Sequence, residues 1–134
     1  MSEENVALVR DRYARFIGAG ENPEEWYDPG FVWDMSTFGG WPEKQHYPGA
    51  TGMNEFLSTW LAAWDDWRLE LDDLRDAGEG RVLAVMRQHG RSKSSGVEVE
   101  MHFAQIWTLK GGRYTRMQMY ASAAEALEAA GLAP

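Results

Sequence analysis

The sequence predicts an α+β fold in which helices pack against one face of a curved antiparallel sheet. Two observations lead to this prediction. Apolar residues recur at spacings of three and four over 6–17 and again over 53–64, which is typical of amphipathic helices. From Trp67 to Ala121 apolar and polar residues alternate instead, as they do in strands that bury one face. Helices followed by a run of consecutive strands favour the α+β class.

The first half of the chain is expected to combine helices with one strand. Asn22 followed by Pro23 is typical of a helix cap and first turn, and the next proline and glycine indicate a turn before the strand. The predicted order is a helix ending at Gly18, a short helix over 22–27, a turn over 28–30, a strand over 31–37 and a long loop over 38–52.

The alternating region is divided into four predicted strands by short polar or glycine-rich breaks at 78–80, 92–96 and 110–113. The strand over 97–109 alternates most regularly, and its neighbours are expected over 82–91 and 114–121. Ser122 and Glu125 have the spacing of a capping box, so a final helix is expected to begin there and to end near residue 131.

The size and charge of the chain limit its organisation and its partners. It has 134 residues, so a single domain over 1–134 is expected. It carries 21 acidic and 13 basic residues, which gives a formal net charge of −8. Nucleic acids and anionic membranes are bound by clustered positive charge, so neither is an expected partner.

Cysteine is absent from the sequence. Disulfides and thiolate metal ligands are therefore excluded, and a reducing compartment suits the chain. The N-terminal residues lack the pattern of a signal peptide, and no apolar run approaches the roughly 18 residues that a membrane helix needs. We therefore expect a cytoplasmic protein.

Aromatic residues and methionine are unusually frequent. The chain contains 7 Trp, 5 Tyr, 5 Phe and 7 Met. Side chains of these types either fill a hydrophobic core or line a cavity that accepts an apolar molecule. A small apolar or aromatic molecule is therefore the expected partner.

Three polar residues lie within otherwise apolar patterns. Gln105 is the polar member of the apolar face of its strand, and a buried amide needs a partner or a ligand. Tyr13 lies on the apolar stripe of the first helix, and Asp34 stands between Trp33 and Met35 in the first strand. If Asp34, Tyr13 and Gln105 converge in one cavity, they supply a carboxylate base with phenol and amide donors for an oxyanion.

Each of these three residues also has a structural interpretation. Gln105 would equally suit a hydrogen bond to a neighbouring loop backbone. A tyrosine such as Tyr13 on an amphipathic helix is often a core residue with its hydroxyl at the rim. Asp34 would also fit a solvated strand end or a turn cap.

The histidines give weaker signals. His89 and His102 lie near Glu100 on what are expected to be adjacent strands, but His102 points away from the face that carries Gln105. Metal sites need three or four convergent ligands, so no metal is expected. His46, in the long loop, is a candidate lid or gate residue. No nucleotide-binding glycine motif occurs, and no cofactor is expected.

Four stretches carry a family resemblance: RYARFIGAGE at 12–21, VWD at 32–34, WTLKGGR at 107–113 and AEALEAAGL at 124–132. Together with the order of elements, they make the whole chain resemble the nuclear-transport-factor-2-like superfamily. This is the cone-shaped α+β fold shared by ketosteroid isomerases and SnoaL-like polyketide cyclases. The resemblance implies a curved antiparallel sheet wrapped by N-terminal helices.

The resemblance also implies roles for single residues. Tyr13 corresponds to the oxyanion-hole tyrosine of ketosteroid isomerases, and Asp34 to their proton-shuttling carboxylate. Gln105 corresponds to their second donor, which is a protonated acid. An amide donates without needing a raised pKa, but it is the weaker donor.

Two functions from different classes are expected. The first is a SnoaL-like enzyme that performs cofactor-free acid/base chemistry, of isomerase, cyclase or dehydratase type, on an apolar carbonyl compound. Asp34 would remove a proton beside the carbonyl, while Tyr13 and Gln105 hold the enolate oxygen. The second is a non-catalytic module that binds a small molecule or dimerises. The expected cavity walls and mouth are Trp33, Trp41, Tyr47, Phe56, Trp60, Met86, Met101, Phe103, Trp107, Met117 and Met119.

A homodimer through an exposed face of the sheet is implied mainly by the resemblance. Ala104 and Ile106 give it some support from the sequence, because they place apolar side chains on the face opposite Gln105.

Overall fold

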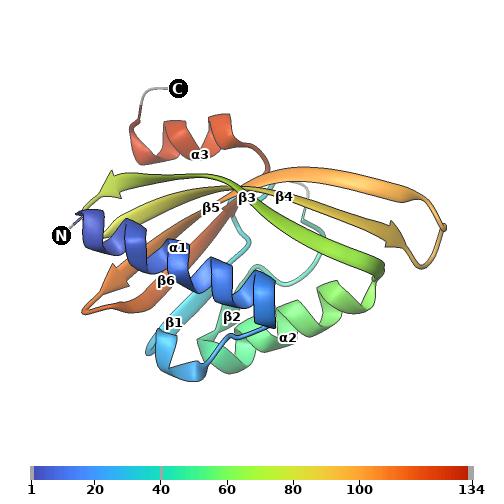
Figure 1. Cartoon of the computed structure of the whole chain (residues 1–134), viewed down its shortest axis with the longest axis horizontal. Coiled ribbons are helices and arrows are strands. Elements are labelled where there is room, and N and C mark those ends of the chain that lie inside the picture. The colour runs from blue at the N-terminus through green and yellow to red at the C-terminus, as the bar shows by residue number, and fades with distance from the viewer. Residues whose placement is uncertain (1, 40, 133–134) are drawn as a thin grey trace.

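The computed structural model describes residues 2–39 and 41–132. Its elements in chain order are α1 (Ser2–Ala19), the 3₁₀ helix η1 (Glu24–Trp26), β1 (Tyr27–Asp34), β2 (His46–Pro48), α2 (Gly49–Ala62), β3 (Trp64–Gly78), β4 (Arg81–Ser92), β5 (Glu98–Lys110), β6 (Arg113–Tyr120) and α3 (Ala123–Ala130). The strands form one six-stranded sheet in the order β2-β1-β6-β5-β4-β3 (Figure 1). Neighbouring strands are antiparallel, except that β1 runs parallel to β6.

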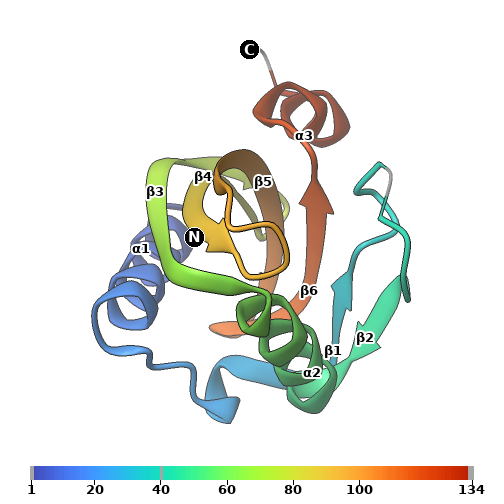
Figure 2. The same ribbon diagram turned by 90° about the vertical axis from the view of Figure 1, so that its right-hand side faces the viewer.

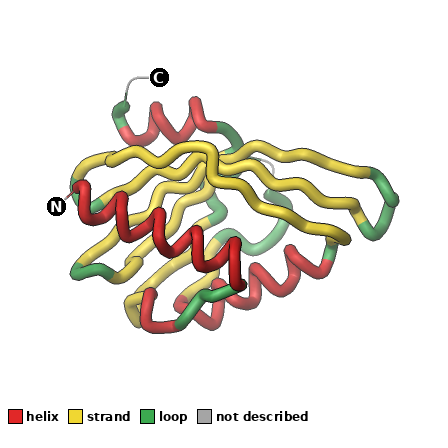
Figure 3. The backbone as a smooth tube through the Cα atoms, in the orientation of Figure 1, coloured by secondary structure: helices red, strands yellow, loops and turns green. Residues whose placement is uncertain are grey.

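The sheet is strongly curved and has helices on both sides. Its inner face curls around α1 and α2 (Figure 2), and its outer face is covered in part by α3. Figure 3 shows the strands as one continuous layer between these helices. The predicted α+β class is therefore confirmed, with the difference that one strand pair is parallel.

The second half of the chain follows the predicted order closely. The strands predicted over 82–91, 97–109 and 114–121 are β4, β5 and β6, with ends displaced by one residue. At the start of α3 the Ser122 hydroxyl accepts a hydrogen bond from the Glu125 backbone N–H at 3.2 Å. The helix ends at Gly131, whose φ of 74° is left-handed and suits glycine.

The first half differs from the prediction in three places. The short helix is only the 3₁₀ turn η1, and the Asn22 side chain does not cap it but accepts a hydrogen bond from the Tyr27 hydroxyl at 2.5 Å. The turn predicted over 28–30 lies inside β1, where the register with β6 shifts. The predicted loop over 38–52 contains β2 and the first turn of α2. Residues 46–48 form a strand because they pair with residues 32–34 at the C-terminal end of β1.

Gly52 explains how α2 packs so closely on β2. A Cβ atom at this position would lie 2.6 Å from the Tyr47 carbonyl carbon, which is nearer than atoms of that kind approach. The absence of a side chain therefore lets the first turn of α2 lie against the backbone of β2, and Tyr47 is buried there.

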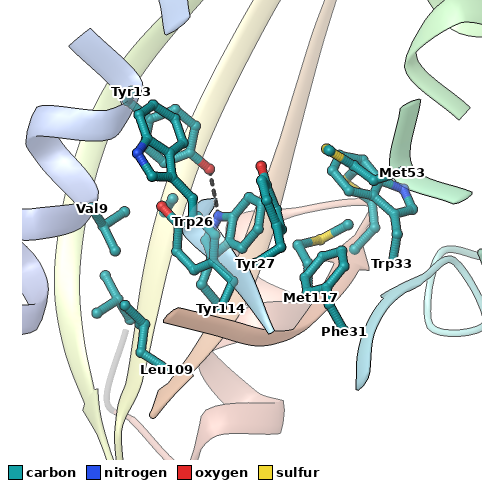
Figure 4. Packing of buried hydrophobic residues seen from close by; sticks show 14 of the residues in the cluster. Val9, Tyr13, Trp26, Tyr27, Phe31, Trp33, Met53, Leu109, Tyr114 and Met117 are labelled. Carbon is teal, nitrogen blue, oxygen red and sulfur yellow. Dashed lines mark hydrogen bonds between the residues drawn. The ribbon is translucent and has the colours of Figure 1, made fainter. Parts of the chain in front are cut away.

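The inner face holds the larger hydrophobic core. Aromatic side chains from α1, β1 and β5 meet there, and Figure 4 shows them with Tyr13 directed from α1 into the group. Phe31 and Val9 are fully buried in this core. Its aromatic composition explains much of the aromatic and methionine content of the chain.

A smaller core lies between the outer face and α3. Ala104 and Ile106 belong to it and are 0% and 1% exposed, beneath the apolar side of α3 that carries Ala126 and Ala130. The expectation that these two strand residues form a free apolar surface for dimerisation is therefore wrong. Within the described residues, none of the helices is long and apolar enough to cross a membrane.

Candidate ligand-binding site

A cavity of about 130 Å³ opens on the inner face of the sheet, between α1, α2 and the loop that follows β1. An engineered cavity of roughly 150 Å³ holds benzene, so this volume suits a compact ring compound. The lining comprises Arg12, Tyr13, Phe16, Asn22, Trp26, Tyr27, Trp33, Met35, Phe38, Trp41, Met53, Phe56, Leu57, Trp60, Trp67, Leu69, Gln88, Met101, Phe103, Gln105, Trp107, Tyr114 and Met119.

One wall of the cavity is a group of aromatic rings from β1, α2 and the loop before β2. The Trp33 and Phe56 ring centres lie 4.9 Å apart, and Trp41 lies 5.4 Å from Phe56. Trp60 stacks on Phe56 with an interplanar angle of 11°. Flat ring faces of this kind pack best against another flat, apolar molecule.

A hydrogen-bonded chain joins Trp107, Tyr13 and Gln105 at one end of the cavity. The indole Nε1 of Trp107 donates to the Tyr13 hydroxyl at 2.7 Å, and that hydroxyl donates to Oε1 of Gln105. Because an indole nitrogen only donates, the Tyr13 oxygen accepts and its proton goes to Gln105. The amide oxygen of Gln105 is therefore occupied by Tyr13, and the amide nitrogen of Gln105 is left for another partner.

The nitrogen of Gln105 lacks such a partner in the protein. Gln105 is 5% exposed and lines the cavity, and no hydrogen bond from its Nε2 is found within residues 2–39 and 41–132. This nitrogen is not among the fully buried atoms without a partner, so it is open to the cavity, where a ligand oxygen or a water molecule can supply the missing hydrogen bond. The sequence prediction that Tyr13 and Gln105 lie together is confirmed.

Tyr13 remains protonated in this environment. Burial raises the pKa of its hydroxyl well above the ordinary value, the nearby Tyr114 raises it further, and the hydrogen bond from Trp107 acts in the opposite direction. A phenol in this state is a hydrogen-bond donor rather than a base.

Gln88 is a second buried amide in the lining, and sequence analysis missed it. Its Oε1 accepts from the indole nitrogens of Trp60 at 2.9 Å and Trp67 at 3.1 Å. Its Nε2 contacts only the Met101 sulfur, at 3.5 Å, and sulfur is a weak acceptor. The signal was available, because Gln88 continues the inward alternation of β4 just as Gln105 interrupts the apolar face of β5.

Arg12 is the charged residue of the lining, and sequence analysis missed it as well. Its guanidinium donates to the backbone carbonyl of Gly112 at 2.6 Å and lies over the rings of Trp26 and Tyr114, 5.2 and 4.8 Å from their centres. Burial raises the pKa of Tyr114 to about 12, against the opposing charge of Arg12. The position of Arg12 on the same helical stripe as Tyr13 could have indicated that it is buried.

Asp34 lies on the outer face of the sheet, away from the cavity. Trp33 and Met35 line the cavity, and Asp34, between them, points to the other side because successive strand residues alternate. Its carboxylate is 1% exposed and is bonded by the Ser36 backbone N–H at 2.8 Å and by the Arg116 guanidinium. The prediction that Asp34 converges with Tyr13 and Gln105 in the cavity is therefore wrong.

The partners of Asp34 also determine its protonation. Burial would raise the pKa of this carboxyl, but the hydrogen bonds from Ser36 and the charge and hydrogen bond of Arg116 outweigh burial, so the pKa lies below its ordinary value. His46 is exposed on β2, with Nε2 3.4 Å from an oxygen of Asp34, so this candidate gate residue also lies outside the cavity lining.

The other predicted wall residues divide into two groups. Tyr47, Met86 and Met117 are buried in the core and do not line the cavity. The remaining predicted wall residues do line it, namely Trp33, Trp41, Phe56, Trp60, Met101, Phe103, Trp107 and Met119.

The histidines of the outer face lie close to acidic neighbours. His89 lies 2.6 Å from Glu70 and 3.3 Å from Glu100, and His102 lies 3.0 Å from Glu100. In the part of the chain that the structure describes, no group of three or more side chains has the arrangement of a metal site.

Comparison with known proteins gives one family. A family model described as a SnoaL-like domain matches residues 10–117, which is more than half of the chain. The sequence matches none of the curated proteins with which it was compared.

Solved structures share the fold at low sequence identity. An NTF2-like protein from Burkholderia thailandensis E264 is 24% identical over 97% of this chain and 98% of its own, with a TM-score of 0.74. A protein described as a SnoaL-like polyketide cyclase, from Jannaschia sp. CCS1, is 17% identical over 99% and 95%, with a TM-score of 0.73. TerC, co-crystallized with polyporic acid, is 20% identical over 95% and 98%, with a TM-score of 0.68. These identities establish the fold alone.

Proposed function

Because this chain belongs to the family of SnoaL-like domains, we propose that its cavity binds a small, flat, largely apolar molecule that carries a carbonyl or similar acceptor oxygen. The observation that carries the proposal is the unpartnered amide nitrogen of Gln105 in an aromatic cavity. A ligand oxygen at this nitrogen gains a hydrogen bond, while its ring gains contact with the aromatic wall.

The hydrogen-bonding groups of the lining favour an acceptor over a donor. Its three amide oxygens all accept bonds from within the protein: Asn22 from Tyr27, Gln88 from two indoles and Gln105 from Tyr13. The amide nitrogens of Gln88 and Gln105 have weak partners or none. A ketone or quinone therefore fits this cavity better than an amine.

Binding is better supported than proton abstraction. Among the described residues that line the cavity there is no Asp, Glu or His, and Tyr13 is held protonated. A general base has to reach the proton that it removes within about 3 Å. Asp34, which was expected to be that base, points to the outer face.

The solved relatives give partial support. TerC was co-crystallized with polyporic acid, so this fold accommodates an organic acid in at least that protein. A protein from Catenulispora acidiphila DSM 44928, 15% identical over 94% of this chain and 93% of its own with a TM-score of 0.67, was solved with trimethylamine. The polar lining of the present cavity favours the first kind of ligand over an amine.

Two matched ligands test the proposal. Acetophenone and ethylbenzene differ in one carbonyl group, and calorimetric titration gives their dissociation constants. We expect acetophenone to bind about three- to tenfold more tightly, which is the effect of one net hydrogen bond. In ¹⁵N-labelled protein the side-chain amide signal of Gln105 is expected to shift with acetophenone and not with ethylbenzene. Equal affinity for the two ligands, with no shift of that signal, overturns the proposal.

The homodimer and the cytoplasmic location remain predictions. Because α3 covers Ala104 and Ile106, a dimer would use other residues of the outer face. Sedimentation velocity at micromolar concentration tests the dimer, and a monomer alone contradicts it.

A further inference from the structure

The two buried glutamines of the cavity have similar surroundings. In Gln105 the amide oxygen accepts from Tyr13, which is itself held by an indole, and in Gln88 the oxygen accepts from two indoles. These donors orient each amide so that its nitrogen is the group left for a further partner. Gln88 is 2% exposed, so bulk water does not satisfy that nitrogen.

The sheet register separates the two amides by a known spacing. Gln105 of β5 lies opposite Ala84 of β4, and Gln88 is four residues further along β4 on the same face. Four residues of strand correspond to about 13 Å. On β5, Met101 lies opposite Gln88, and Phe103, opposite Met86, lines the cavity between the levels of the two amides. The amides therefore stand at opposite ends of one aromatic cavity.

We infer that Gln88 is a second specificity-determining residue, and that the ligand is a compact single-ring compound with an acceptor oxygen at each of two opposite ends. The inference rests on the proposed function and adds the far end of the ligand. An oxygen near Gln88 would accept from the amide nitrogen, which otherwise has only the Met101 sulfur as partner. A ligand with an acceptor at one end alone leaves one amide nitrogen unsatisfied.

A donor group at the Gln88 end would be rejected. The oxygen of Gln88 already accepts two indole N–H groups, and its nitrogen carries only donors. An amine placed there meets donors and finds no free acceptor, which is a specificity built from an unfavourable contact.

A series of single-ring ketones tests the inference on the wild-type protein. Acetophenone has one carbonyl group. In 1,4-diacetylbenzene the second carbonyl is para to the first, at the opposite end of the ring. In 1,3-diacetylbenzene it is meta to the first, so the two carbonyls do not lie at opposite ends. We expect 1,4-diacetylbenzene to bind about three- to tenfold more tightly than either other ketone. In ¹⁵N spectra it is expected to shift the side-chain amide signals of both Gln88 and Gln105.

The Gln88→Glu variant provides a matched change at the far end. The carboxylate keeps an oxygen for Trp60 and Trp67 but has no N–H donors. The two indole N–H groups that face it favour the ionised form, and measurements at alkaline pH favour that form further. We expect the advantage of 1,4-diacetylbenzene over acetophenone to disappear. We expect 4-aminoacetophenone, which carries a donor at the far end, to bind more tightly to this variant than to wild type.

The outcomes separate this inference from the proposed function. If acetophenone is preferred over ethylbenzene but the second carbonyl gives no gain and leaves the Gln88 signal in place, the two-ended ligand is wrong and the proposed function stands. If none of the three ketones is preferred over ethylbenzene, the two-ended ligand and the proposed function are both wrong. Should Gln88→Glu fail to fold, the wild-type series and its amide shifts decide alone.

Discussion

Arg116 and Asp34 form an ion pair on the outer face of the sheet, directly behind the aromatic wall of the cavity. Asp34 stands next to Trp33 in β1, so one strand residue serves the cavity and its neighbour serves the opposite surface. This arrangement gives the carboxylate a structural part in holding β1 against β6, and it leads to the first two predictions.

Asp34→Asn is expected to lower stability without abolishing ligand binding. The change removes the ion pair with Arg116 and weakens the bond from the Ser36 N–H, at a cost of about 1–3 kcal/mol. Urea denaturation measures the loss, and titration with acetophenone measures binding. Asp28→Asn, at an exposed hydrogen bond to Gly30, is the control and should change stability less. A folded Asp34→Asn protein that has lost binding tenfold would contradict the assignment of Asp34 to the outer face.

The same carboxyl predicts a dependence of stability on pH. The pKa of Asp34 lies below its ordinary value of 3.8 in the folded protein, so its contribution is present above that pH and is lost as the pH falls further. The difference in unfolding free energy between wild type and Asp34→Asn is therefore expected to be largest near neutral pH. It should shrink below about pH 4. Urea midpoints of both proteins at pH 7 and pH 3 provide the measurement, and a constant difference is the contrary result.

Tyr13→Phe and the double variant Tyr13→Phe/Gln105→Leu isolate the amide of Gln105. The single change removes the hydroxyl between Trp107 and Gln105 and is expected to cost about 1–3 kcal/mol of stability. It keeps the Gln105 amide in the cavity, where a ligand oxygen itself selects the amide nitrogen, so the preference for acetophenone over ethylbenzene should persist. The double variant also lacks the amide, and the preference should fall by about three- to tenfold.

The two tyrosine variants are compared only with each other, because both lack the Tyr13 hydroxyl. Calorimetric titrations at one temperature give the four dissociation constants. An unchanged preference in the double variant would show that Gln105 does not hold the ligand oxygen.

Gly52→Ala tests the close contact of α2 with β2. The added Cβ would lie 2.6 Å from the backbone of Tyr47, so we expect a loss of more than about 2 kcal/mol. Gly18→Ala is the matched control, because nothing lies within 4 Å of a Cβ there and alanine favours the helix by about 0.5–1 kcal/mol. Thermal unfolding of both variants checks the prediction. Similar stability of the two proteins would indicate that α2 can move away from β2 at little cost.

Much of the fold could be predicted because its signals are local. The alternation over β4, β5 and β6 and the cap at Ser122 depend on residues close together in the chain, and the structure reproduces them with small shifts. The pairing of Tyr13 with Gln105 could be anticipated for a related reason. Each is a polar group on an apolar face, and burial of that face obliges it to find a partner.

The errors concern relationships between distant segments. The parallel pairing of β1 with β6 and the burial of Ala104 and Ile106 under α3 depend on where later elements pack, and no local pattern contains that information. The inward position of Gln88 follows from the alternation of β4, but its hydrogen bonds to two indoles depend on other elements.

The sequence by itself therefore determined the order of helices and strands, the aromatic character of the interior, and one of its two buried amides. Tertiary structure alone decided which side of β1 faces inward, and with it whether Trp33 or Asp34 enters the cavity. The physical reason is that strand alternation requires neighbouring side chains to take opposite faces but does not choose between them. That choice follows from the free energy of burying Trp33 against α2 while Arg116 neutralises Asp34 on the other side.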